Sequence, residues 1–168
     1  AFRRGEYIYW DYQFNSNFFS EEFIEEFQDY VNWDAISWNQ KLSHKFIEKF
    51  EAKLNFDLLS SYQDLSEETI RKYSDKVSWD RVSACQKLSI EFVEEFQDKI
   101  KWHSLSYNKN LTTAIIKKFS HKLYFNGFIR RIKLPRYLVD NFFDENCSIH
   151  VPYCFFNKNY KYTWKTFL

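Results

Sequence analysis

The chain has 168 residues and a formal net charge of +1, and it combines 22% aromatic residues with only 2 glycines and 2 prolines. A hydrophobic content of 45% is enough for a folded core and excludes a disordered chain. So few glycines exclude dinucleotide-binding and P-loop folds, whose glycine-rich loops approach phosphate, and argue against β-rich folds with many tight turns. The composition therefore favours helices joined by short loops.

A repeat of 23 residues organises most of the chain and is the strongest signal in the sequence. Five apolar columns keep this spacing without an insertion. They are Trp10, Trp33, Phe56, Trp79, Trp102 and Phe125; Phe19, Leu42, Leu65, Leu88, Leu111 and Leu134; Phe27, Phe50, Tyr73, Phe96, Phe119 and Phe142; Val31, Leu54, Val77, Ile100 and Leu123; and Ile36, Leu59, Val82, Leu105 and Phe128. A unit starts near each member of the second column.

The first part of each unit has the signals of a short amphipathic helix. In the unit that starts at Leu42, Ser43 is a good N-cap, and Leu42 and Ile47 occupy the two positions of a hydrophobic staple. The same staple recurs as Phe19/Ile24, Leu65/Ile70, Leu88/Val93 and Leu111/Ile116. The apolar stripe predicts a helix of about 9–11 residues. Lysines near its end, Lys53, Lys76, Lys99 and Lys122, suit the helix dipole.

The second part of each unit predicts a further helix of about eight residues. Asn32, Asn55 and Ser78 are good N-caps placed directly before an aromatic residue of the first column. Helices this short must bury their faces against neighbouring helices. We therefore predict an all-α protein, an α-solenoid of about six two-helix repeats of 23 residues.

The two ends of the chain depart from the repeat. Ala1–Ile8 is either a divergent cap or part of a unit inside which the chain begins. At the other end, Leu134-Pro135 starts the first helix of the last unit. Cys147–Leu168 has no repeat, and its alternation allows a small β-hairpin. The sequence therefore predicts a helical repeat domain over 1–146 and a small, irregular C-terminal cap over 147–168.

Two sets of repeated residues have both a structural and a functional interpretation. The aromatic columns could offer stacking platforms to nucleic-acid bases, but a core role is favoured because they share the register of Leu, Ile and Val. The second set is polar and comprises Ser37, Ser60, Ser83 and Ser106 with Gln40, Gln63 and Gln86. It could line a groove, but we favour a structural role in which serine permits close helix approach and glutamine bonds the adjoining corner's backbone.

Charge divides the chain into two unlike halves. Residues 1–84 carry 10 Lys and Arg against 16 Asp and Glu, whereas residues 85–168 carry 14 against 7. Ten basic residues and no acid lie between Lys99 and Arg136. Such a run predicts an anionic partner or an acidic protein surface. The candidate partner- or anion-binding residues are Lys99, Lys101, Lys117, Lys118, Lys122, Arg130, Arg131, Lys133 and Arg136.

No residue pattern predicts catalysis or a metal centre. Cys147, His150 and Cys154 stand close together, but no fourth ligand has zinc-like spacing, although His121 and Asp144 are available. A structural cap with reduced thiols is therefore favoured. The histidines occupy unrelated columns, and the repeated Glu pairs belong to the solvent face, so we expect no enzyme activity and no cofactor.

Cysteine usage and hydropathy bear on the compartment. Three cysteines form no disulfide framework, which favours a reducing interior. No window reaches the roughly 18–20 apolar residues of a membrane span, and no signal-peptide pattern opens the chain. We expect an intracellular protein without a membrane partner.

The unit from Leu88 to Trp102, LSIEFVEEFQDKIKW, followed by Leu105 and Ser106, resembles a short repeat of uncharacterised proteins from large DNA viruses and large phages. The segment FSEEFIEEF from Phe19 fits that repeat closely, whereas the units at Thr112 and Pro135 depart from it. The match spans about Trp10 to Lys133, and the richness in Phe, Asn, Lys and Tyr suits an AT-rich genome. The resemblance implies a helical repeat and a viral setting, and it implies no catalytic residue.

These observations predict a non-catalytic interaction or scaffold protein, virus-encoded, in the cytoplasm of the host cell or in the virion. A protein partner is favoured, with the basic residues of the C-terminal half as the contact surface. The alternative is binding or sequestration of nucleic acid or of a small phosphorylated ligand by the same residues. Head-to-tail self-association through the opposed charges is a further alternative.

Overall fold

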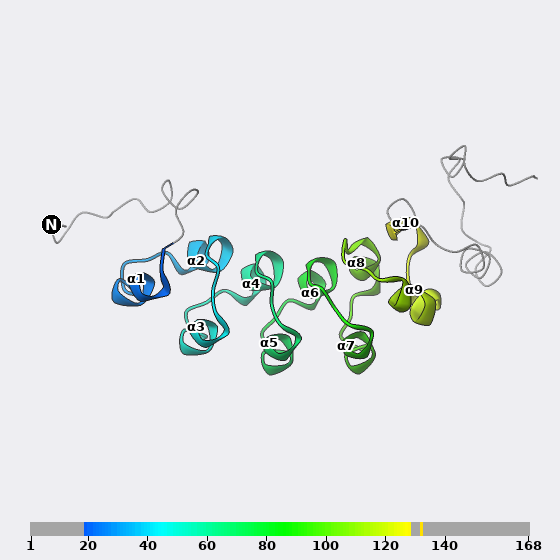
Figure 1. The fold of residues 1–168 in the computed structure, drawn as a ribbon, viewed down its shortest axis with the longest axis horizontal. Coiled ribbons are helices and arrows are strands. Elements are labelled where there is room, and N and C mark those ends of the chain that lie inside the picture. The colour runs from blue at the N-terminus through cyan, green and yellow to red at the C-terminus, as the bar shows by residue number, and fades with distance from the viewer. Residues whose placement is uncertain (1–18, 129–131, 133–168) are drawn as a thin grey trace, which may run out of the picture. The chain divides into compact units, whose positions relative to one another are not determined.

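The computed structural model describes residues 19–128 and Ile132, and within them every regular element is a helix (Figure 1). The all-α prediction is thereby confirmed for this part of the chain. Internal contacts divide the chain into two units, Ala1–Leu134 and Pro135–Leu168, and the described residues all belong to the first.

Some expectations fall outside the described residues. They are the N-terminal segment Ala1–Ile8, the half unit at Trp10, the unit that starts at Leu134, the domain boundary at 146 and the cap with its β-hairpin over 147–168.

The first helices begin where the sequence predicts. They are α1 (Glu21–Glu26), α3 (His44–Lys49), α5 (Glu67–Lys72), α7 (Ile90–Glu95) and α9 (Thr113–Phe119), the last continued by the 3-10 helix η1 (Ser120–Lys122). Each α-helix follows a Ser or Thr whose side-chain oxygen accepts a backbone N–H of the first turn; Ser43 Oγ accepts from Phe46 N–H at 3.2 Å. Such a cap satisfies a donor that the helix itself leaves free and contributes about 1 kcal/mol.

The second helices are α2 (Trp33–Asn39), α4 (Phe56–Tyr62), α6 (Trp79–Cys85), α8 (Trp102–Tyr107) and α10 (Phe125–Phe128). Asn32 and Asn55 cap α2 and α4 as predicted. Ser78 stands at the N-cap position of α6, as predicted, but its side chain makes no capping hydrogen bond. Asn55 and Ser78 share a ψ of 105°, and at this backbone angle only the longer amide reaches the first-turn N–H groups.

The helices are shorter than predicted. The first helices have six or seven residues and the second helices four to seven. α3 ends because Phe50 adopts φ −113° and ψ 23°, after which Lys53 and Leu54 donate their N–H groups to Phe50 O at 2.9 and 3.1 Å. Apolar spacing continues through this turn to Leu54, so periodicity alone could not separate the helix from the turn.

The second helices pack against one another in chain order. α2 contacts α4, α4 contacts α6, α6 contacts α8, and α8 contacts α10. Figure 1 shows α2, α4, α6 and α8 in one row and α3, α5 and α7 in a second row beside it. Helices of six or seven residues are not stable alone, so their stability comes from this contact with neighbours.

The core consists of the columns that the repeat predicts. Ile36, Leu59, Val82 and Leu105 are buried, as are Ile47 of α3 and both staple residues of α5, α7 and α9. The rings of Trp33 and Phe50 have their centroids 5.1 Å apart, and Trp79 and Phe96 repeat this contact at 5.1 Å. The core interpretation of the aromatic columns is confirmed for the buried members Phe50, Phe56, Tyr73 and Phe119, whereas Phe27, Trp33, Trp79, Phe96 and Trp102 are only partly buried.

Candidate partner-binding surface

The serine column joins neighbouring units from inside. Ser37, Ser60, Ser83 and Ser106 are all fully buried. Ser60 Oγ donates to Phe56 O at 2.6 Å and accepts from Ser78 N–H at 3.2 Å, so one hydroxyl bonds both its own helix and the start of the next second helix. The other three serines repeat both bonds. These hydroxyls are engaged within the fold.

The glutamine column bonds the backbone of the adjoining unit. Gln86 Nε2 donates to Ser60 O at 2.8 Å and to Gln63 O at 2.7 Å, while Gln86 Oε1 accepts from Leu65 N–H at 3.0 Å. This geometry confirms the structural interpretation of the polar column. Ser and Gln do not line an open groove.

The fourth member of the glutamine column is a residue that the sequence analysis missed. The 23-residue register places Lys109 there, but Asn108 Nδ2 donates to Ser83 O and Gln86 O, both at 2.8 Å. α8 is one residue shorter than α6, so the amide arrives one position earlier. An amide residue directly before the expected position was the available signal.

The first helices and the turns that follow them carry exposed ion pairs between successive units. The pairs are Lys49–Glu25, Lys53–Asp29, Lys72–Glu48, Lys76–Glu51, Arg71–Glu95, Lys99–Asp75 and Lys118–Glu94. The hydrogen bond from Lys72 holds the pKa of the Glu48 carboxyl below its ordinary value, and the same bond raises the pKa of the Lys72 ammonium. Exposed pairs stabilise little individually, but these neutralise much of the charge on the first helices.

A column of lysines lies over the aromatic column. The Nζ atoms of Lys53, Lys76, Lys99 and Lys122 lie 5.3, 5.6, 5.6 and 4.8 Å from the ring centroids of Trp33, Phe56, Trp79 and Trp102. This is the geometry of a cation–π contact. The sequence suggested only a helix-dipole role for these lysines, although each follows its aromatic residue by the same 20 positions.

The predicted basic residues do not share one environment. Lys99 pairs with Asp75 at 3.1 Å, Lys118 pairs with Glu94 at 2.6 Å, and Lys122 donates to Gln97 at 3.0 Å. Lys117 lies exposed on α9. Arg130, Arg131, Lys133 and Arg136 fall outside the described residues, as do Cys147, His150 and Cys154.

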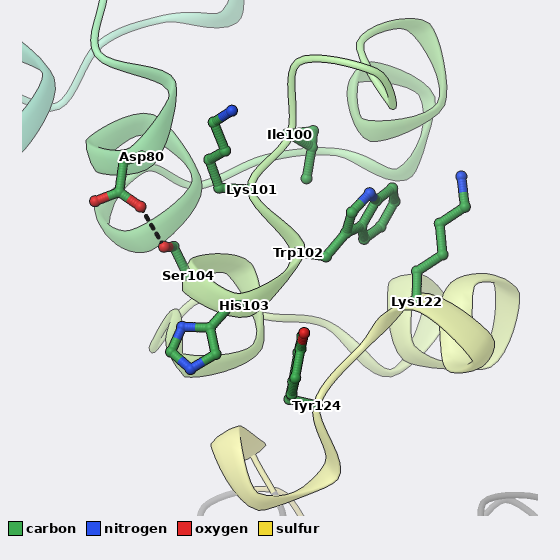
Figure 2. A pocket seen from close by; sticks show the side chains of 8 residues that line it. All are labelled: Asp80, Ile100, Lys101, Trp102, His103, Ser104, Lys122 and Tyr124. Carbon is green, nitrogen blue, oxygen red and sulfur yellow. Dashed lines mark hydrogen bonds between the residues drawn. The ribbon is translucent and has the colours of Figure 1, made fainter. Parts of the chain in front are cut away.

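Lys101 differs from the other described lysines of the predicted set. It precedes α8 at the N-cap position, it is exposed, and its Nζ makes no ion pair or hydrogen bond with another described residue. Lys101 and Lys122 line the same shallow hollow of about 670 Å³, together with Asp80, Ile100, Trp102, His103, Ser104 and Tyr124. Figure 2 shows the Trp102 ring between the two lysine side chains.

Large aromatic side chains are exposed on the second helices and beside them. Trp38, Tyr62, Tyr107 and Tyr124 are 48%, 59%, 51% and 55% exposed. The rings of Trp38 and Tyr62 have their centroids 5.7 Å apart, across α2 and α4. His103 lies between Tyr107 and Tyr124, with centroid distances of 5.1 and 5.0 Å. We call the exposed residues of α2, α4, α6 and α8, with Lys101 and Tyr124, the second-helix surface.

These exposed aromatics do not form a strict column of the repeat. Trp38 and Tyr107 share one position of the repeat, but Ser61 and Ala84 stand at the same position in the units between them. Tyr62 lies one position further along. The 23-residue spacing therefore does not predict these exposed aromatic residues, because they do not recur in every unit.

A metal-ligand cluster and a membrane-spanning helix are both absent from the described part of the chain. No three His, Cys, Asp or Glu side chains there come together as metal ligands would. Nor does any helix between residues 19 and 128 have the length and apolarity to cross a bilayer.

Comparison of the chain with protein-family models, with curated proteins and with solved structures gives no match in any of the three. The resemblance to viral repeats therefore stays a prediction.

Proposed function

We propose that the chain is an α-solenoid of about six two-helix units and that it acts as a non-catalytic interaction module, binding a polypeptide through the second-helix surface. The repeated contacts of α2 with α4, α4 with α6 and α6 with α8 support the stacked arrangement. Stacked units of this kind form extended binding surfaces from many equivalent helices.

The exposed aromatic side chains carry this proposal. Tyr and Trp are enriched among the residues that dominate protein-protein binding energy, because they bury a large area at low entropic cost. Trp38 and Tyr62 are about half exposed and lie side by side on adjacent helices. The first helices present a different surface, on which opposite charges of successive units pair with each other.

Charge favours a polypeptide over a nucleic acid. Asp34, Asp57 and Asp80 stand at one exposed position of α2, α4 and α6, where they repel phosphate groups. Of the basic residues that could attract phosphate, Lys99 and Lys118 are paired within the chain. Nucleic acid or a phosphorylated ligand at the basic residues is therefore the second candidate.

A viral origin is part of the proposal, supported by the FSEEFIEEF and LSIEFVEEF segments. It predicts that the partner is a protein of the host cell or another component of the virion.

The test replaces the exposed aromatics and measures capture of proteins from a lysate of the host cell. The double variant Trp38→Ala/Tyr62→Ala loses the captured partner, since both side chains leave the surface without disturbing the core. Tyr30→Ala is the matched control, because Tyr30 is 72% exposed but lies in the turn after α1 and not on a second helix. Equal capture by the double variant and by the control would contradict this surface as the binding site.

A further inference from the structure

The charge of the second-helix surface changes at α8 in two columns at once. The second position of these helices is Asp34, Asp57 and Asp80 in three successive units and His103 in the next. The residue before the helix is Asn32, Asn55 and Ser78 in the same three units and Lys101 in the next. The surface therefore runs from an acidic part over α2, α4 and α6 to a basic part at α8.

The acidic part contains one exposed cation, Arg81 of α6, and this guanidinium forms no ion pair with a described acid. Asp34 Oδ1 accepts from Asn55 Nδ2 at 2.8 Å, and Asp80 Oδ1 accepts from Ser104 Oγ. None of the three aspartates forms an ion pair with a described basic residue, whereas the acids of the first helices commonly do. Packed helices lie about 8–10 Å apart, close to the screening length at physiological salt, so the fields of the three carboxylates reinforce one another.

The basic part combines two lysines with aromatic rings. Lys122 Nζ lies 4.8 Å from the centroid of Trp102, and Lys101 opens onto the same hollow with its charge unpaired by any described acid. His103 and Tyr124 form the other side of the hollow (Figure 2). Asp80 also lines the hollow, and its carboxylate accepts a hydrogen bond from Ser104 Oγ. A second carboxylate that enters beside Lys101 and Lys122 meets two ammonium groups and the polar edges of the rings.

We propose that the second-helix surface binds a polypeptide segment whose charges follow the opposite order. A basic cluster of the segment lies over Asp34 and Asp57, apolar side chains pack on Trp38, Tyr62 and Tyr107, and an acidic side chain enters the hollow beside Lys101. This inference rests on the proposed function and specifies the partner's chemistry. The distance from α2 to α8 is about 24–30 Å, so the segment needs about eight extended residues to reach both parts.

The experiment selects binders from a library of random 16-residue peptides displayed on phage, with the full chain as target. We expect the selected peptides to carry Lys or Arg at one end, Asp or Glu at the other, and apolar residues between. Selected peptides without this separation of charge would overturn the proposal. Failure to select any peptide would overturn the proposed function as well.

Charge-reversal variants then test the placement with one selected peptide, synthesised with a fluorescent label. Asp34→Lys/Asp57→Lys weakens its binding at least tenfold. Glu26→Lys/Glu91→Lys changes net charge equally but lies on α1 and α7, and it leaves binding within about twofold. Unchanged circular dichroism shows that each variant is folded, and equal losses from both variants would contradict the placement.

The basic part is tested by exchange of charge. Lys101→Glu weakens binding of the selected peptide. Replacing the peptide's acidic residue with Lys restores binding to this variant but not to the unaltered chain. Trp38→Ala/Tyr62→Ala distinguishes the binding surface from the order of charges. If this variant still binds the peptide, the proposed surface is wrong. If it loses peptide binding while the charge-reversal variants keep it, only the proposed order of charges is wrong. Tighter binding of a 15-nucleotide oligo(dT), abolished by Lys101→Glu, would replace the polypeptide with a nucleic acid.

Discussion

The hydroxyl of Ser60 accepts the backbone N–H of Ser78 and donates to Phe56 O, with no access to solvent. A buried N–H without an acceptor costs about 1–3 kcal/mol, since no water replaces the lost bond. The serine column thus couples the start of each second helix to the preceding unit. Serine is required both for its small size and for its oxygen.

Replacing Ser60 with alanine tests this role. Ser60→Ala keeps the small volume but leaves the N–H of Ser78 without an acceptor, so we expect a loss of about 1–3 kcal/mol in unfolding free energy by urea denaturation. Ser61→Ala is the control, because the partly exposed Ser61 hydroxyl bonds only Asp57 O of its own helix. A loss of equal size in both variants would contradict the coupling between units.

Sequence reasoning at the scale of residues identified which side chains repeat but not their partners. The spacing of Ser37, Ser60, Ser83 and Ser106 showed a structural column, yet the N–H that each accepts lies 18 residues further on in the next unit. Which donor meets which acceptor depends on how two units dock. For the same reason, the pairing of Lys118 with Glu94 was not foreseen.

At the scale of helices, α10 approaches α8 more closely than a side chain permits. A Cβ built at Gly127 would lie 2.6 Å from both C and O of Ser106, which are backbone atoms and cannot move aside as a flexible side chain can. The preceding units have Ala35, Leu58, Arg81 and Ser104 at this position. Glycine is therefore required for the close approach of this last described pair of helices.

We predict that Gly127→Ala destabilises the protein by about 1–3 kcal/mol, as overpacking does. Helix propensity alone predicts the opposite, since alanine favours a helix by about 1 kcal/mol over glycine. Asn126→Ala is the matched control on the exposed side of the same helix. Thermal unfolding of both variants decides between these effects, and a stabilised Gly127→Ala would show that α10 does not contact α8 so closely.

Helix starts were predictable and helix ends were not. A start is marked by local chemistry, as when Ser43 caps α3 through the N–H of Phe46. The end of α3 at Phe50 has no such mark, because its change of ψ lets the following residues turn back toward the second helix. That change is imposed by packing and leaves the apolar spacing intact.

At the scale of the whole molecule, nearly every contact between units repeats at a fixed interval. Side chains bond partners 18 or 21 to 26 residues away, and many of these bonds recur along the described part of the chain. In such an architecture, stability is close to a sum over units and their interfaces. Removing one entire unit should therefore preserve the fold.

Deletion of residues 65–87 tests this expectation. It removes 23 residues and joins Asp64 to Leu88, so that each remaining residue keeps its place in the repeat. We expect unchanged ellipticity per residue at 222 nm and a cooperative but earlier urea transition, because one interface fewer contributes. Deletion of residues 65–75 breaks the register and serves as the comparison; similar behaviour of the two deletions would contradict the stacked arrangement.

The sequence by itself determined the 23-residue period, the helical class of the described part, the helix starts and the apolar core. These follow from local capping chemistry and from spacing along one chain, and the repetition makes both easy to recognise. Only the tertiary structure decided which charges pair, where the first helices end, how Asn108 takes the place expected of Lys109, and which aromatics reach the surface. Those properties depend on the distance between docked units, and a period measured along the chain contains no such distance.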